Sequence, residues 1–99
     1  MTKLSVSIVT YDVARELFVS VLSGLSDAVN DAVSKNLLQT HSVVIVDNGD
    51  DGDFLRDVVK QFDSLHCHVI DSPQNTGFGG GHNRALQECD TELHLILNP

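Results

Sequence analysis

The sequence is poor in basic residues, in cysteine and in long apolar runs. Only 6 Lys and Arg residues stand against 14 Asp and Glu residues, which gives the 99-residue chain a formal net charge of −8. A field of this sign repels nucleic acid and anionic lipid, and the basic residues are too scattered to form a local basic patch. We therefore expect no nucleic-acid partner.

The few cysteines and the short apolar runs exclude further classes of protein. Cys67 and Cys89 alone cannot form a disulfide framework, and their spacing does not match a zinc-binding CxxC pair. No apolar run approaches the roughly 18 to 20 residues that span a bilayer, and the N-terminus lacks the features of a secretory signal. These absences predict a cytoplasmic protein with reduced thiols.

What remains is the composition of one folded domain. Hydrophobic residues make up 41% and charged residues 20% of the chain, which excludes a disordered tail or a coiled coil. Strand-length apolar segments alternate with segments of helical periodicity. We expect strands at 4–11, 43–47, 67–71 and 93–97, and helices at 14–25, 27–34, 53–62 and 81–88.

The helix boundaries follow from local signals. Asp12 and Asp53 are expected to cap the first and third helices, and Gly24 is expected to break the first helix from the second. The alternation of strands and helices, joined by right-handed crossovers, predicts an α/β fold. It is expected to have three α/β/α layers and a mostly parallel, Rossmann-like sheet with strand order 3-2-1-4.

The end of the sequence leaves the last strand without a cover. Asn98 and Pro99 follow directly after a strand that looks buried. We therefore expect residues 1–99 to be one domain truncated at its C-terminus, with self-association through the exposed edge of the sheet.

Candidate binding residues lie where strands end, because parallel sheets bind ligands at their carboxyl edge. This rule selects Thr10, Tyr11, Asp12, Asp47, Asn48 and the loop after Asp71. Asp47 lies at the end of its strand, where a carboxylate can accept hydrogen bonds from a base or a ribose. For Asp50, Asp51 and Asp53, a turn followed by a helix cap is the interpretation that we favour over a binding role.

A glycine-rich segment, SPQNTGFGGGHNRAL at residues 72–86, precedes the last helix. Glycines allow close approach of a ligand, and a helix N-terminus suits a phosphate, so the segment predicts a phosphate or diphosphate site. The alternative is a flexible turn. The segment is neither a dinucleotide fingerprint nor a P-loop, since it lacks the third glycine and a following Lys-Ser or Lys-Thr.

The five histidines do not predict a metal site. His66 and His68 point to the same side of a strand and Cys67 to the other, and the other three are far apart in the sequence. Ordinary surface or partly buried histidines are the interpretation that we adopt.

Taken together, VSIVTYD, VVIVDNG, PQNTGFGGGHNRAL and LHLILNP resemble the inverting glycosyltransferases of family 2, which have the GT-A nucleotide-sugar fold. The resemblance is greatest to bacterial rhamnosyltransferase-like members. It implies a nucleotide-sugar-binding half of the domain. The residues that it assigns to this site are Thr10 and Tyr11 in the pocket, Asp47 at the base, Asn75, Gly77, Gly81 and Asn83 under the ribose and diphosphate, and Arg84 beside them.

The resemblance also implies the reaction of a full-length enzyme. A sugar, such as rhamnose, passes from a nucleoside-diphosphate donor to a polysaccharide or glycolipid acceptor, with Mg²⁺ or Mn²⁺ held by an acidic residue just after Pro99. No catalytic residue and no metal ligand is then expected within this chain, which is predicted to be inactive by itself. The full-length enzyme is expected in the cytoplasm or at the inner face of the membrane. The alternative is a non-catalytic α/β nucleotide-binding or regulatory module.

Overall fold

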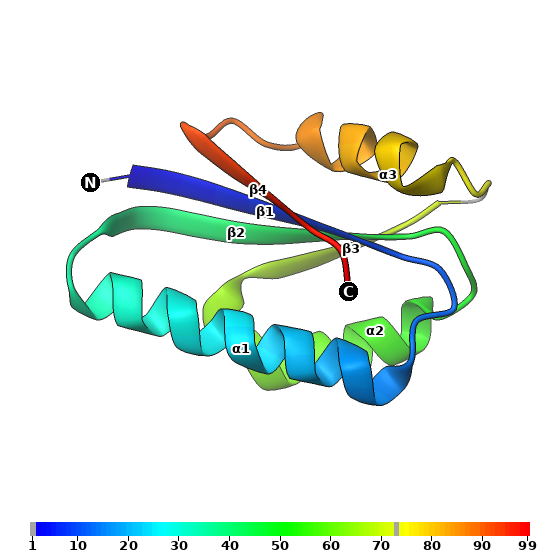
Figure 1. Cartoon of the computed structure of the whole chain (residues 1–99), viewed down its shortest axis with the longest axis horizontal. Coiled ribbons are helices and arrows are strands. Elements are labelled where there is room, and N and C mark those ends of the chain that lie inside the picture. Colours follow the sequence, from blue (N-terminus) through cyan, green and yellow to red (C-terminus); the bar gives the residue numbers. More distant parts are fainter. Residues whose placement is uncertain (1, 73) are drawn as a thin grey trace.

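A parallel sheet with helices on both faces organises the chain (Figure 1). The computed structural model describes residues 2–72 and 74–99. In chain order, the elements are β1 (Thr2–Thr10), α1 (Arg15–Ser34), β2 (Leu38–Asp47), α2 (Gly52–Val59), the 3₁₀ helix η1 (Lys60–Leu65), β3 (Cys67–Asp71), α3 (Gly77–Leu86) and β4 (Leu93–Leu97).

The sheet has the order β3-β2-β1-β4, and every neighbouring pair of strands is parallel. The predicted fold class and strand order are therefore confirmed. Both β1 and β2 begin earlier than the predicted residues 4 and 43. The extra residues of β2 are largely polar, so the apolar pattern did not mark them as a strand.

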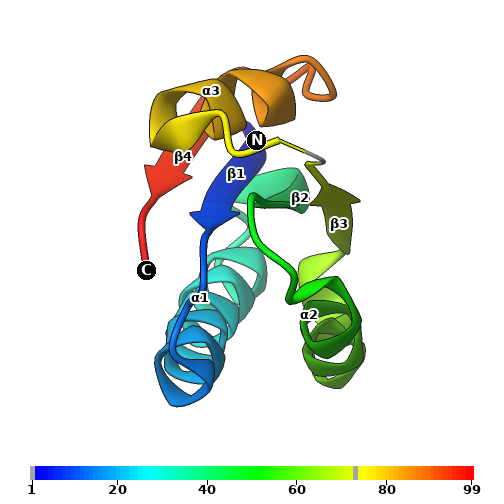
Figure 2. The same cartoon turned by 90° about the vertical axis from the view of Figure 1, so that its right-hand side faces the viewer.

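The two faces of the sheet carry separate cores, because successive side chains of a strand point to opposite sides. Figure 2 shows α1 and α2 on one face and α3 on the other. The larger core lies under α1, α2 and η1, and its buried residues include Val6, Ile8, Phe18, Leu22, Ile45 and Leu55. The smaller core lies under α3 and consists of Val9, Val44, Val46, Ile70 and Ala85.

Helix α1 corrects two predictions. It runs without a break from Arg15 to Ser34. Gly24 lies on its exposed surface, where a side chain would meet no other part of the protein, so the helix loses no tertiary contact by having glycine there. Its N-cap residue is Ala14, and no side chain caps it. Asp12 instead adopts a positive φ of 49°, a conformation that Asp tolerates better than most residues, and so forms the turn that leads into the helix.

The predicted helix at 53–62 is also divided differently. Helix α2 begins at Gly52, so Asp53 lies inside its first turn and is not the cap. The helix ends at Val59 and continues as η1, in which Phe62 has a non-helical backbone with φ of −126°. Phe62 is thereby packed against the larger core.

Helix α3 begins four residues earlier than predicted, at Gly77. Gly77 has a positive φ of 74°, and its N–H donates to the Oδ1 atom of Asn75 at 2.9 Å. This local hydrogen bond and packing on the sheet offset the low helix propensity of glycine. Gly81 is buried against β1, where an added Cβ atom would lie 2.6 Å from the Cγ2 atom of Val9.

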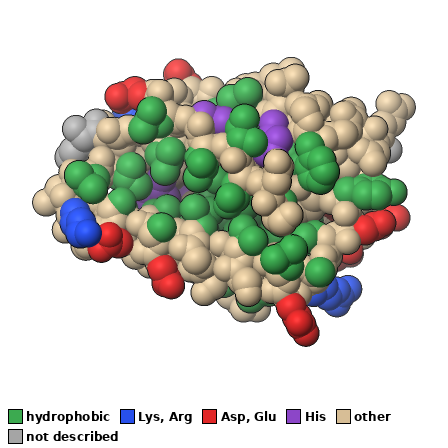
Figure 3. Space-filling model, viewed as in Figure 1, with side chains coloured by type: hydrophobic (Ala, Val, Ile, Leu, Met, Phe, Trp, Pro, Cys, Tyr) green, Lys and Arg blue, Asp and Glu red, His purple; other side chains and the backbone are tan. Residues whose placement is uncertain are grey.

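Strand β4 lies at the edge of the sheet and exposes apolar side chains. Leu93, Leu95 and Ile96 are exposed, as is Leu17 of α1. Figure 3 shows hydrophobic side chains gathered on the face where β4 lies in front of the sheet. Self-association through this surface stays a prediction. Within the described residues, no helix has the length and apolar character that crossing a membrane requires.

Two glycines, one packed against β1 and one exposed, test the packing of α3. Gly81→Ala forces a methyl group against Val9, whose branched side chain cannot turn away, and we expect a loss of about 1–3 kcal/mol in the free energy of unfolding. Gly24→Ala places a methyl group in open space on α1, and we expect a gain of about 0.5–1 kcal/mol. Urea unfolding measures both. Equal effects of the two substitutions would contradict the close packing at Val9.

Candidate functional site

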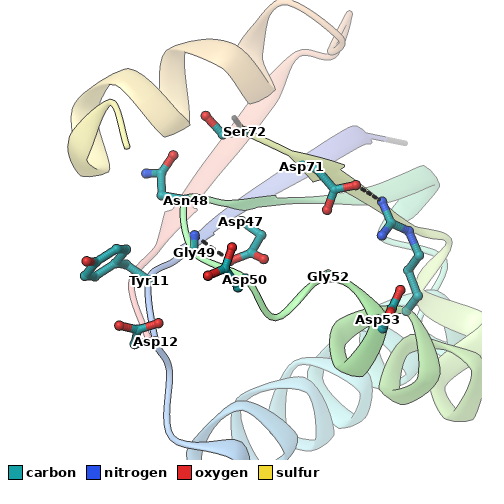
Figure 4. A pocket seen from close by; sticks show the side chains of 11 residues that line it. Tyr11, Asp12, Asp47, Asn48, Gly49, Asp50, Gly52, Asp53, Asp71 and Ser72 are labelled. Carbon is teal, nitrogen blue, oxygen red and sulfur yellow. Dashed lines mark hydrogen bonds and ion pairs between the residues drawn. The ribbon is translucent and has the colours of Figure 1, made fainter. Parts of the chain in front are cut away.

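A cavity lies at the carboxyl edge of the sheet. In the sheet register Thr10 pairs with Asp47, and Asp47 pairs with Asp71, so three strands end side by side. The cavity has a volume of about 500 Å³, within the range of small-molecule sites. Figure 4 shows that its lining comes from the ends of β1, β2 and β3 and from the start of α2.

The carboxylate of Asp47 connects these elements. Its Oδ1 atom accepts hydrogen bonds from the Thr10 hydroxyl at 3.1 Å and from the Gly49 N–H at 3.0 Å, and its Oδ2 atom accepts one from the Asp51 N–H at 2.9 Å. The side chain is 1% exposed. Asp47 therefore lies where the sequence predicted it, but its oxygens already hold β1, the turn and the first residues of α2 together.

Gly49 allows the turn after β2 to approach the turn after β1. A Cβ atom at this position would lie 3.2 Å from the Oδ1 atom of Asp12 and 3.6 Å from that of Asp47. Only a residue without a side chain fits between these two carboxylates without moving one of them. The close approach brings Tyr11 and Asp12 to the cavity that Asp47 borders.

Asn48 has the least satisfied side chain of the site. The residue is 7% exposed, and its Nδ2 atom donates to the carbonyl oxygen of Gly77 at 3.1 Å. Among the described residues, its Oδ1 atom is the only buried side-chain nitrogen or oxygen without a hydrogen-bond partner. A buried acceptor without a partner is unfavourable, so a donor supplied by a ligand would stabilise this site.

Arg56 and Asp71 form a further part of the cavity that the sequence did not single out as a pair. The Arg56 Nη2 atom lies 2.6 Å from the Asp71 Oδ2 atom, and this hydrogen bond raises the pKa of the guanidinium above its usual value. Gly52 lies directly beside the pair, and an added Cβ atom would lie 2.9 Å from the Arg56 Nη1 atom. The start of α2 thus leaves room for the guanidinium.

Several of the predicted residues gather around Tyr11, which is 55% exposed. A smaller cavity of about 150 Å³ lies between Tyr11, Asn48 and the start of α3, where Asn75 and Gly77 also line it. Thr10 is fully buried and borders another small cavity beside Tyr11. The structure therefore brings five of the eight predicted site residues, Thr10, Tyr11, Asp47, Asn75 and Gly77, to one edge of the sheet.

The other three predicted residues do not line the cavities around Asp47 and Tyr11. Gly81 packs on Val9 in the interior. Asn83 is exposed on α3, and Arg84 lines a cavity of about 240 Å³ between β3 and α3 that shares Asp71 and Ser72 with the 500 Å³ cavity. Their roles beside the ribose and diphosphate stay a prediction.

The described residues do not form a metal site. In residues 2–72 and 74–99, no three His, Cys, Asp or Glu side chains are placed to hold an ion together. The cavity is nevertheless acidic, because five aspartates line it and Arg56 is the one basic residue among its described lining residues. The aspartates of the lining are Asp12, Asp47, Asp50, Asp53 and Asp71.

The cysteines offer no nucleophile to this site. Cys67 lies on β3, and burial raises the pKa of its thiol to about 11. The thiol is therefore protonated at neutral pH, and the thiolate is the reactive form. The Cys89 Sγ atom donates to the carbonyl oxygen of Ala85 on the other side of the sheet.

Substitution of Asp47 tests its structural role. Asp47→Ala leaves the Thr10 hydroxyl and two backbone N–H groups without their acceptor, and we expect a loss of about 3 kcal/mol in the free energy of unfolding. Asp50 is exposed and lines the same cavity, so Asp50→Ala is expected to change stability by less than about 0.5 kcal/mol. Urea unfolding of both variants checks this, and an Asp47→Ala protein as stable as Asp50→Ala would refute the role.

Comparison with known proteins agrees with the fold. Among solved structures, the chain is similar to the mannosyltransferase PcManGT from Pyrobaculum calidifontis, whose structure is in complex with GDP-Man and Mn²⁺. The TM-score is 0.65 and the sequence identity 19%, over 98% of this chain and 27% of that one. The chain thus spans about a quarter of the length of this relative. A search of curated proteins gives no significant match.

The sequence itself matches a family model. The model of glycosyl transferase family 2 aligns with residues 5–98, which contain all four strands apart from the first residues of β1. Because the match extends over nearly the whole sequence, the chain belongs to glycosyl transferase family 2.

Proposed function

We propose that this chain binds the nucleotide of a sugar donor for a glycosyltransferase reaction. The observation that carries the proposal is the buried, unpartnered Oδ1 atom of Asn48 at the carboxyl edge of a sheet of this family. The similarity in fold to a mannosyltransferase in complex with GDP-Man supports a nucleoside-diphosphate sugar as the ligand.

The charges of the site favour one orientation of this ligand. The aspartates of the 500 Å³ cavity can accept hydrogen bonds from the N–H groups of a base and the hydroxyl groups of a ribose. They repel phosphate groups at close range. We therefore place the base and ribose in this cavity, and the diphosphate outside it, toward Tyr11 and the start of α3.

Within this arrangement, Asn48 and Asp47 have different tasks. Asn48 Oδ1 accepts a hydrogen bond from the base, whereas Asp47 holds the backbone that carries Asn48. In this proposal Asp47 acts on the base indirectly, whereas the family resemblance implies a direct contact. Tyr11, exposed between the cavities, is placed to contact the sugar or phosphate side of the nucleotide.

The finer identity of the reaction is also part of the proposal. A thymidine-diphosphate donor carrying rhamnose and a polysaccharide or glycolipid acceptor follow from the sequence resemblance alone. A non-catalytic nucleotide-binding module is the alternative, and it differs by having no transferase activity even when donor and acceptor are supplied to the full-length protein.

Titration calorimetry with uridine, thymidine and guanosine diphosphates tests the binding site. We expect weak binding of one of them, because the chain carries a net charge of −8. Asn48→Ala is expected to reduce the affinity about tenfold, the usual effect of removing one hydrogen bond to a buried group. Since the described residues form no metal site, Mn²⁺ should change the affinity by less than about twofold.

The control for this experiment is Asn30→Ala, which removes an exposed amide on α1, outside the cavities. It should leave the affinity unchanged. If none of the three nucleotides binds, or if Asn48→Ala binds as tightly as Asn30→Ala, the proposed site is wrong. Far-UV circular dichroism of each variant shows that the fold is retained.

A further inference from the structure

A chain of hydrogen bonds joins α3 to β4 on the face of the sheet that carries the smaller core. The Ser7 Oγ atom lies 2.6 Å from the Nδ1 atom of His82 and 2.8 Å from the Nε2 atom of His94. The other nitrogen of His82, Nε2, lies 2.9 Å from the Oδ1 atom of Asn98. Two imidazole rings thus share one hydroxyl group.

The chain continues from the other side of His94. Its Nδ1 atom lies 2.6 Å from the Ser5 Oγ atom, which lies 2.7 Å from the Thr91 Oγ1 atom. Thr91 in turn donates to the carbonyl oxygen of Leu93 at 2.9 Å. Ser5 and Ser7 are fully buried, and His82 is 6% exposed.

The groups do not have enough hydrogens for these bonds when both imidazoles are neutral. This chain of hydrogen bonds has six members, and each bond needs one hydrogen. The three hydroxyl groups and two neutral imidazoles supply five hydrogens, since a neutral imidazole has one N–H. The Asn98 Oδ1 atom and the Leu93 carbonyl oxygen, at the two ends, only accept.

One additional proton completes the chain. If it lies on His82, that ring donates to Asn98 and Ser7, and each later group donates to the next as far as Leu93. If it lies on His94, that ring donates to Ser7 and Ser5, and Ser7 donates to His82. Transfer of the Ser7 hydrogen to His94, together with transfer of the His82 Nδ1 proton to Ser7, therefore exchanges the two arrangements without breaking the chain of hydrogen bonds.

A second proton does not fit. Both rings would then donate to Ser7, whose own hydrogen would have no acceptor in the chain, and two adjacent cations would repel each other. Burial, and then repulsion from His82, lowers the pKa of His94 below its ordinary value of 6.5.

The arrangement is not a catalytic Ser-His pair. Ser7 is fully buried, and neither it nor the two histidines lines any of the four cavities. A substrate therefore has no access to the hydroxyl group. The histidines also lie on the face of the sheet opposite α2, away from Arg56 and the acidic cavity.

We propose that His82 and His94 form a shared site for a single proton, relayed by Ser7, and that binding of this proton fastens β4 to α3. Loss of the proton removes one hydrogen bond, which falls at Asn98 or Thr91 because these solvent-accessible ends are the least costly to release. The attachment of the edge strand is therefore sensitive to pH.

The charged groups near this site lie on neighbouring elements and are not part of the chain of hydrogen bonds. In the described residues, no carboxylate or ammonium group is hydrogen-bonded to either ring, and β2 faces it with Ser42, Val44 and Val46. The charged or titratable groups on the neighbouring elements are Lys3 of β1, His68 of β3, Arg84 of α3, and Glu88, Cys89, Asp90 and Glu92 before β4. Of these, His68 and Glu88 lie 3.6 Å from each other.

Nitrogen NMR of the histidine rings between pH 4.5 and 9 tests the proposal, with His41, His66 and His68 as references in the same protein. We expect the pair to take up one proton and to resist the second until the fold is lost. Two neutral rings at a pH where the references are charged would overturn the proposal, since the Asn98 amide nitrogen would then face His82. Two rings that charge together in the folded protein would overturn it as well.

Variants at the exposed Asn98 provide the second measurement. Asn98→Asp should raise the apparent pKa of the first proton by about one unit, and Asn98→Ala should lower it by about one unit, as expected for a hydrogen bond to a charged group. Ser42→Ala, in register with Ser5 on the neighbouring strand, is the control and should leave the titration unchanged. Equal titrations in the two Asn98 variants would refute the shared proton site.

Discussion

The carboxylate of Asp47 is the interaction on which the carboxyl edge of this domain depends. It is buried, and it accepts hydrogen bonds from the end of β1, from the turn after β2 and from the residue before α2. Parallel pairing alone brings β1 and β2 together, but it does not fix the turns beyond them. With the carboxylate in place, the backbone at Asn48 and Gly49 has one conformation, and the cavity has a defined wall.

This arrangement is compatible with the proposed binding of a nucleotide at an acidic site. Carboxylates repel phosphate groups but accept hydrogen bonds from the donor groups of bases and ribose. They therefore favour the base and ribose inside the cavity and the phosphate groups outside it. The proposed orientation follows from this separation and from the position of Asn48, whose Nδ2 atom is already bonded to Gly77. That bond turns the oxygen away from Gly77 and joins the end of β2 to the start of α3.

The strands and their order could be predicted from the sequence, because apolar β-branched segments and right-handed crossovers are strong signals. The helix starts could not, because capping signals at Asp12 and Asp53 competed with turn geometry, and because Gly81 of α3 is stabilised by packing on Val9 and not by helix propensity. At the site, Asp47 was predicted at the right position. The different tasks of Asp47 and Asn48 depend on hydrogen bonds to residues elsewhere in the chain, which the sequence does not reveal.

The sequence also did not reveal that two of the histidines lie close together. His82 and His94 are separated by 12 positions, and only the pairing of β4 with β1 places both on Ser7. The exposed leucines and isoleucine of β4 give little preference for one register, because a strand without a buried face can slip along its neighbour. A slip of one residue would turn His94 to the opposite face and remove the imidazole that bonds both Ser5 and Ser7, which is costly because both hydroxyl groups are buried. The polar side chains therefore add to the preference for one register of the edge strand, beyond what Leu97 supplies by packing against the larger core.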